Sequence, residues 1–351
     1  MSGRPTNDLP TPPQGTGRSE LPSEKRGIVP GTAPQGGRQG LSLPAGIALC
    51  ALGGMVATST FSLLGPVFLA YGYLVVARGG DGKVRALGAL AAVATAVVLS
   101  FSLGTSAVVS SVVSCLVAII ACEALLAGRL TPGLGCVVVG AAAVCSIGAD
   151  SIIASAQGTT IKETVMEALD VIESSLDGST IAVGTVMSAI KAAMSVLWPF
   201  SYVLASFGSY LFATIGMGMA TGRGTGEGPV VPRLVTYDLP LWVVGALVVS
   251  AAGLAVGITV EGALPHAVLV VSANLVMALR LPFAAQGLAV LVWLLDSKGL
   301  SPLVKGLVGA LALYLEVQFV VMTIVGLVDV WANFRHLPRG AEAAADAGET
   351  A

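Results

Sequence analysis

The chain has 351 residues, of which 55% are hydrophobic and only 11% are charged. With a mean hydropathy of +0.87, it is not an ordinary soluble globular protein, and it is predicted to be an all-α, polytopic membrane protein because several apolar runs reach the roughly 20 residues that a spanning helix needs. Its net charge of −2 provides no field of Lys and Arg to neutralise phosphates, so we expect no nucleic-acid partner.

The chain offers little material for catalysis or metal binding. It has two histidines, and all five cysteines lie in apolar runs without a CxxC pair, so the cysteines are predicted to be small packing residues. No HExxH motif, GxSxG motif or phosphate-binding loop occurs in the sequence. We therefore expect a protein that is not an enzyme, that holds no metal or cofactor, and whose first partner is the lipid bilayer.

Both ends of the chain are polar. Residues 1–42 are rich in Pro and Gly and poor in large apolar residues, so they cannot recover the entropy lost on ordering and are predicted to form a disordered tail. Residues 337–351 are predicted to form a second one. The membrane domain is expected to cover residues 43–336.

The first apolar run, Leu43–Ala77, is broken at Gly65 and Pro66, where a helix must end or kink. It is either a short hairpin of two spans or one long kinked helix. The basic loop 78–85 that follows is expected in the cytoplasm under the positive-inside rule. Further spans, which together with the last third make eight or nine, are predicted at Ala86–Phe101, Ala107–Ala127, Leu134–Ala149, Ala192–Ala220 and Pro240–Ile258.

Small residues recur at four-residue spacing on several of these helices, which lets helix backbones approach closely. We expect these stripes to pack tightly within the chain, although on the first helix the alternative is a docking face for a partner helix. The stripes are Gly46, Cys50, Gly54 and Thr58; Gly88, Ala92 and Ala96; Ser106, Ser110, Ser114, Ala118 and Cys122; and Gly245, Gly253 and Gly257.

Residues 151–191 make the only sizeable polar excursion inside the membrane domain. Apolar residues of the stretch Ile161–Leu176 fall on one helical face and the acidic residues lie mostly elsewhere, which is typical of an amphipathic helix. We expect this helix to lie on the outer surface of the membrane or to fold over the domain. A second helical stretch, Ile181–Ile190, leads into the next span, which contains Pro199.

The last third holds two long apolar runs, Pro265–Leu295 and Leu303–Val328, joined by a polar turn, and it predicts a membrane-spanning hairpin. Arg280 lies 18 residues before Lys298, and Glu316 lies 18 residues after it. Antiparallel folding about the turn brings the two charges to one level, roughly 20 to 25 Å from the turn, where an unpaired charge is costly. An ion pair is therefore predicted.

Other polar residues of the last third could serve this pair or the packing of the helices. Gln318 and Asn274 are predicted to line a ligand pocket or ion path together with the ion pair, the alternative being that the pair is only a structural bridge. Gln286 is expected to bond between helices. Asp329 and Arg335, six residues apart at the membrane edge, are expected to order the C-terminal end or to meet another helix.

Charge placement is consistent with the alternation of spans except at the C-terminus. The alternation puts the C-terminal tail outside although the tail carries Arg335, which conflicts with the positive-inside rule. Splitting the preceding run at residues 280–282 would move the tail inside but would put Lys298 outside. Glu123 and Asp150, near the ends of their spans, are predicted to be boundary residues.

The order of features in the last third resembles the YybS-like family of predicted bacterial membrane proteins. The resemblance covers about residues 43–336, and Asn333 stands where the family commonly has a second acid. More distantly, that family is similar to the substrate-binding subunits of energy-coupling-factor vitamin transporters, which bind their ligand toward the outer side. The residues that carry the resemblance are Trp198-Pro199, the run from Tyr237 to Trp242, Asn274, the run from Gln286 to Val290, and the run from Gly326 to Arg335.

The resemblance and the deep polar residues imply a multi-pass protein of the bacterial inner membrane. Its expected role is a non-enzymatic subunit that binds a small molecule or assists transport, with a transporter energising subunit as its expected partner. The alternative is a membrane scaffold for cell-envelope or division machinery.

Overall fold

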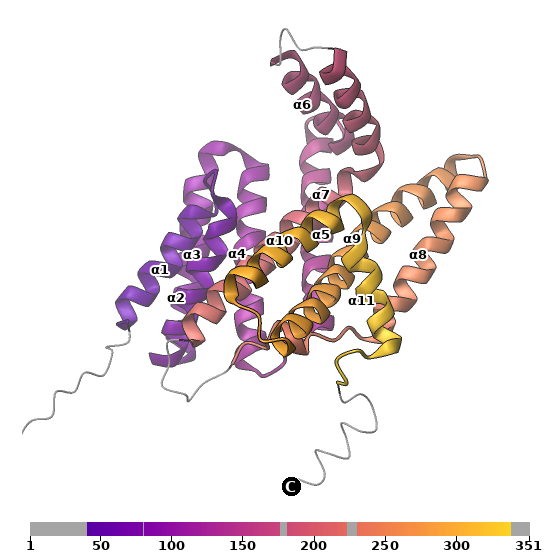
Figure 1. Cartoon of the computed structure of the whole chain (residues 1–351). Helices are drawn as coiled ribbons and strands as arrows, with labels where there is room; N and C mark the ends of the chain where they lie inside the picture. The colour runs from indigo at the N-terminus through magenta and orange to yellow at the C-terminus, as the bar shows by residue number, and fades with distance from the viewer. Residues whose placement is uncertain (1–40, 80, 176–180, 223–229, 338–351) are drawn as a thin grey trace, which may run out of the picture. The chain divides into compact units, whose positions relative to one another are not determined.

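The computed structural model describes residues 41–79, 81–175, 181–222 and 230–337. Within these ranges the chain forms eleven α-helices and no β-strand (Figure 1). Eight helical segments of the described chain are long and apolar enough to cross a membrane, so the predicted all-α, polytopic architecture is confirmed. The predicted tails lie almost entirely outside the described residues.

The first half of the chain packs around one apolar core. The break before Pro66 separates two helices, α1 (Leu43–Val56) and α2 (Gly65–Gly79), so the run is a hairpin and not one long kinked helix. The second arm, Ser62–Gly79, is long enough to be a candidate membrane span, whereas α1 has only 14 residues. Together with α3 (Gly82–Ser100), α4 (Thr105–Leu126) and the last third of α7 (Ile181–Thr221), they bury this core.

The predicted small-residue stripe on α1 packs within the chain. A Cβ atom at Gly54 would lie 2.0 Å from the carbonyl oxygen of Ala92 on α3, and one at Gly72 of α2 would lie 2.7 Å from the carbonyl oxygen of Gly46. Side chains at these positions would force the helices apart. Thr58, at the end of the stripe, lies beyond α1.

The amphipathic excursion is confirmed as α6 (Ile161–Ser175), which follows α5 (Pro132–Ala156) and packs against α7. Thr160 and Glu163 form a capping box at its start, because each accepts a hydrogen bond from the backbone N–H of the other, at 3.2 and 2.8 Å. These bonds lower the pKa of Glu163, the backbone bond from Thr160 most strongly. Lys191 of α7 pairs with Asp170 and Glu173, which fixes α6 to α7.

A second apolar core is built from the second half of the chain. It joins α8 (Leu241–Thr259), α9 (Ala263–Ser297) and α11 (Val321–Ala332) around the fully buried Phe283. Because α9 runs without interruption through Pro282, the alternative that splits this run into two spans is wrong.

The single span predicted at Leu303–Val328 is also wrong. It is divided into α10 (Pro302–Phe319) and α11 at Val320, whose left-handed backbone (φ 59°) is rare for a β-branched residue. The chain therefore reverses between α10 and α11. Glycine allows α11 to pack closely against α9, since a Cβ at Gly287 would lie 2.0 Å from the carbonyl oxygen of Met322.

The contacts between α11 and α9 give the direction of the last helix. Thr323 bonds the carbonyl oxygen of Arg280, and Asp329 bonds Gln286. Residue numbers rise together along the two helices, so α11 runs in the same direction as α9. Its C-terminus then lies at the same membrane face as the basic turn after α9, which removes the conflict over the charge of the tail.

We predict that reporter domains fused after Leu337 and inserted after Gly299 will be on the same side of the membrane. The reason is that α10 and α11 together cross and return. A reporter inserted after Glu261, in the loop between α8 and α9, serves as the control for the opposite side. Protease protection in oriented vesicles measures sidedness, and a Leu337 fusion that behaves like the Glu261 insertion would contradict the reversal at Val320.

Candidate functional site

The predicted ion pair between Arg280 and Glu316 is confirmed, with 3.3 Å between Arg280 Nη2 and Glu316 Oε1. Glu316 has further partners at the start of α11, because it accepts from the backbone N–H of Thr323 at 2.9 Å and from its hydroxyl at 2.7 Å. A carboxylate at a helix N-terminus is favoured by the exposed N–H groups there. The pair thus holds the reversal at Val320 in place.

The residues predicted to extend this pair into a pocket do not join it. Gln318 is exposed. Asn274 is buried and bonds α7 instead, where its amide accepts from the N–H of Phe200 and donates to the carbonyl oxygen of Val196, both at 2.8 Å. The amide bridges a donor and an acceptor that an unbroken helix joins directly, one residue beyond Pro199, which kinks helices. Asn274 therefore stabilises α7 at its proline.

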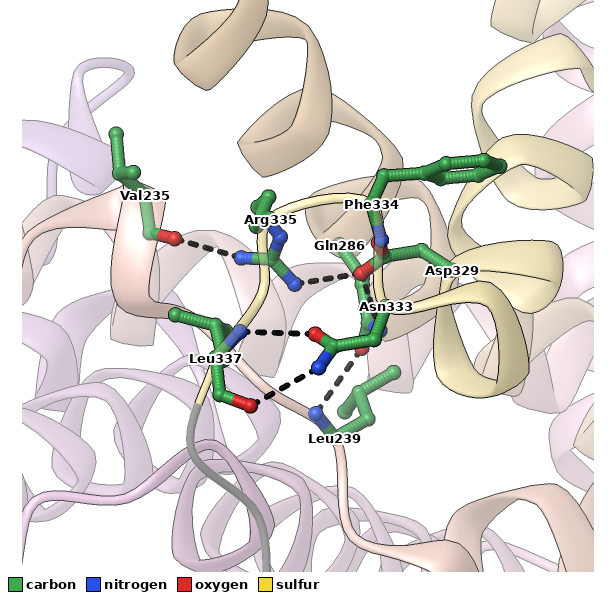
Figure 2. A network of polar contacts seen from close by, with 8 residues as sticks. All are labelled: Val235, Leu239, Gln286, Asp329, Asn333, Phe334, Arg335 and Leu337. Carbon is green, nitrogen blue, oxygen red and sulfur yellow. Dashed lines mark hydrogen bonds and ion pairs between the residues drawn. The ribbon is translucent and has the colours of Figure 1, made fainter. Parts of the chain in front are cut away.

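A more deeply buried network, shown in Figure 2, links three segments. The side chains of Arg335 and Asp329 are both fully buried and pair at 2.7 Å. Gln286 of α9 donates to Asp329 at 3.1 Å and accepts from the N–H of Leu239 at 3.0 Å, while Arg335 donates to the carbonyl oxygen of Val235 at 2.7 Å. The network joins the C-terminal end to α9 and to the segment before α8, so the expectation that these residues order the C-terminus is confirmed.

Asn333 completes this end of the chain. Its backbone is left-handed (φ 44°), which Asn tolerates better than most residues. Its side-chain amide exchanges two hydrogen bonds with the backbone of Leu337, at 3.0 and 2.9 Å, and the N–H of Phe334 donates to Asp329 at 3.0 Å. These bonds close a compact turn after α11 (Figure 2).

A cavity of about 450 Å³ lies elsewhere, among α4, α5, α7 and the segment that joins α1 to α2. It was not predicted. Ser106, Ser110 and Ser114 line it from α4, so the prediction that this part of the α4 stripe packs tightly is wrong. Only the C-terminal part of the stripe, Ala118 and Cys122, is fully buried against other helices. The serines that resembled packing residues instead form a hydroxyl-rich wall.

One carboxylate, Asp150 of α5, also lines this cavity. It accepts from the hydroxyl of Ser106 at 2.5 Å and from that of Tyr202 on α7 at 2.8 Å. Asp150 was expected only to mark the end of its span. Its hydrogen bonds instead join three helices, α4, α5 and α7. Ser114 and Ser209 bond across the cavity wall at 3.0 Å.

Two buried serines of the cavity wall have no partner in the described chain. Ser146 is 8% exposed and Ser206 is 5% exposed, yet neither hydroxyl forms a hydrogen bond with another described residue. Serines in helices commonly bond the carbonyl of the preceding turn, but these two do not, and neither Oγ is among the fully enclosed side-chain atoms of the described chain that lack a partner, so both oxygens are accessible from the cavity. Both hydroxyls are therefore available to a polar molecule that enters the cavity.

The chemistry of this site is that of binding. It presents hydroxyl oxygens and one carboxylate, with no basic side chain in its described lining. In the part of the chain that the structure describes, no three residues among His, Cys, Asp and Glu are grouped so that they could hold a metal ion. The spacing of Ser106, Ser110 and Ser114, followed by an acid near the end of the next apolar run, is the signal that could have revealed this site.

We predict that Arg335→Met will lower the free energy of unfolding by about 3 to 5 kcal/mol, because it removes the guanidinium group that compensates the buried negative charge of Asp329. The double variant with Asp329→Leu should lose less than the sum of the single variants. Arg233→Met, at an exposed position, is the control. Unfolding in mixed micelles measures the effect, and additive losses would show that the two charges are not coupled.

We predict that Asn274→Leu will destabilise the protein by about 1 to 3 kcal/mol, because the N–H of Phe200 and the carbonyl of Val196 lose their partner. Adding Pro199→Ala should restore most of this loss, since an uninterrupted α7 can join the two groups directly. The same unfolding assay applies. A double variant as unstable as Asn274→Leu would mean that the amide does more than stabilise α7.

Comparisons of the chain with family models, with curated proteins and with solved structures give no match. A functional hypothesis therefore depends on the geometry described above, in which two polar clusters serve the fold and one hydroxyl-lined cavity is open to a ligand.

Proposed function

We propose that this chain is a binding or transport-associated protein of the cytoplasmic membrane that takes a small polar solute into the cavity between α4, α5 and α7. The observation that carries the proposal is the pair of buried serines, Ser146 and Ser206, whose hydroxyls face this cavity without a partner in the described chain. Polar groups at this depth need hydrogen bonds. A polar solute supplies them.

The position of the cavity along the helices supports binding from the outer side. On α4, Ser106 lines the cavity, whereas Glu123, which pairs with the basic-loop residue Arg85 at 3.2 Å, lies 17 residues (123 − 106) further on. That separation is about 25 Å at 1.5 Å per residue. Since the basic loops are expected inside, the cavity belongs to the outer half of the membrane. Outer-side binding is also what the more distant similarity to the substrate-binding subunits of energy-coupling-factor transporters implies.

The Arg280 and Glu316 pair is less suited to bind a ligand. Glu316 has three partners within the chain, namely Arg280 and both the N–H and the hydroxyl of Thr323. A ligand would have to displace bonds that hold α11 in place. We therefore assign ligand binding to the cavity and a structural role to the pair.

The scaffold hypothesis retains less support. It relied on small-residue faces as docking surfaces, and the face of α1 is used at Gly54 against Ala92 within the chain. The amphipathic helix α6 is still available to a partner. Cross-linking in native membranes separates the two roles, because a transporter energising subunit as main partner favours solute binding, and a cell-wall or division protein favours the scaffold.

We predict that at least one small polar metabolite will raise the melting temperature of the purified protein in lipid nanodiscs. In the double variant Ser146→Ala with Ser206→Ala that shift should be lost. The variant's melting temperature without solute should be unchanged, because neither hydroxyl bonds the described chain. Ser188→Val, at an exposed position on α7, is the matched control. A broad metabolite screen in which nothing shifts the wild-type protein would contradict the proposal.

A further inference from the structure

We infer that the cavity selects a small organic cation that carries hydroxyl groups, with Asp150 as the residue that binds its positive charge. This inference rests on the proposed function and concerns the chemical class of the solute. It follows from the charges that line the cavity, from the hydrogen-bonding capacity left on Asp150, and from the size of the space.

Among the described residues that line the cavity, Asp150 alone is charged. None of the ion pairs of the described chain includes it. The other span-embedded acids have basic partners, such as Arg280 for Glu316 and Arg335 for Asp329. A carboxylate in a membrane protein normally pairs with a cation or a buried donor network, so Asp150 differs from the paired acids Glu316 and Asp329 in that a positive charge can still be added beside it.

Asp150 retains the capacity to bind more donors. A carboxylate has about four acceptor sites, and Asp150 uses one oxygen for Ser106 and the other for Tyr202. An ammonium group has three donors and carries the complementary charge, which makes its bonds to a carboxylate stronger than those of a neutral donor. An anion would meet the negative charge of Asp150 without any basic side chain to offset it.

The two unpartnered serines extend the site along the same helix faces. Ser146 precedes Asp150 by four residues on α5, and Ser206 follows Tyr202 by four residues on α7. Residues four apart are neighbours on one face of a helix. Ser146 and Ser206 therefore lie one helical turn from Asp150 and Tyr202, on the cavity wall where the hydroxyl groups of a bound cation can meet them.

The size of the cavity favours an organic cation over a bare metal ion. Its volume is about 450 Å³, whereas one water molecule occupies about 30 Å³ in the liquid. Ligand pockets for small organic molecules typically measure about 300 to 1,000 Å³. An alkali ion would leave most of the polar wall without contact.

Two size-matched series of probes test the inference by calorimetry on the protein in nanodiscs at constant ionic strength. One series is glucosamine, glucose and glucuronate, and the other is 2-aminoethanol, ethylene glycol and glycolate; each runs from cation to neutral molecule to anion. We expect the cation of at least one series to bind about tenfold or more tightly than its neutral analogue, and the anion to bind most weakly. Asp150→Asn, which keeps the size of the side chain and one acceptor oxygen but carries no charge, should remove the preference for the cation, and Asp296→Asn, at an exposed ion pair, should keep it.

The other outcomes are distinguishable. Equal binding of cation and neutral analogue, or a cation preference that survives Asp150→Asn, would overturn the inference and leave the proposed function standing. Stabilisation by sodium or potassium ions alone, lost in Asp150→Asn, would show a metal-ion site and would also overturn it. If neither these probes nor the metabolite screen gave binding, both the inference and the proposed function would fail.

Discussion

Every polar group that enters the membrane-spanning part of this chain must find its partner within the protein, because hydrocarbon offers none. The structure meets this demand where its backbone departs from regular helix. Asn274 bridges α7 next to Pro199, Glu316 caps α11 after the reversal at Val320, and Arg335 bonds the irregular segment at Val235. The buried polar side chains of the second half are thus the means by which irregular backbone is accommodated at depth.

The cavity holds polar side chains whose hydrogen-bonding capacity is not fully used within the described chain. Ser146 and Ser206 are as buried as Asn274, but their hydroxyls have no partner in the described chain. Asp150 has hydroxyl partners and no basic one. Hydroxyls that line a cavity without a partner, beside a carboxylate without a basic partner, are a physical reason to assign ligand binding to this place, and that reason is independent of any family resemblance.

The sequence predicted the helical architecture and the pairing of Arg280 with Glu316, because hydrophobic run length and equal distance from a turn are local quantities. The break at Val320 could not be predicted, since a β-branched residue gives no signal for left-handed backbone. Half of the partners of Gln286 and Arg335 are backbone groups of Val235 and Leu239, which leave no mark in the sequence. The cavity was missed because serines at four-residue spacing look the same whether the facing helix touches them or stands away from them.

The packing of α11 against α9 also determines when, during synthesis of the chain, the contacts of α9 can form. Arg280 lies on α9, but its acidic partner is at the end of α10, and the groups that fix this partner belong to α11. Gly287 of α9 likewise lies against Met322 of α11. A ribosome must therefore complete α10 before the guanidinium group of Arg280 can meet its counter-ion, and must complete α11 before Thr323 can fix that counter-ion in place.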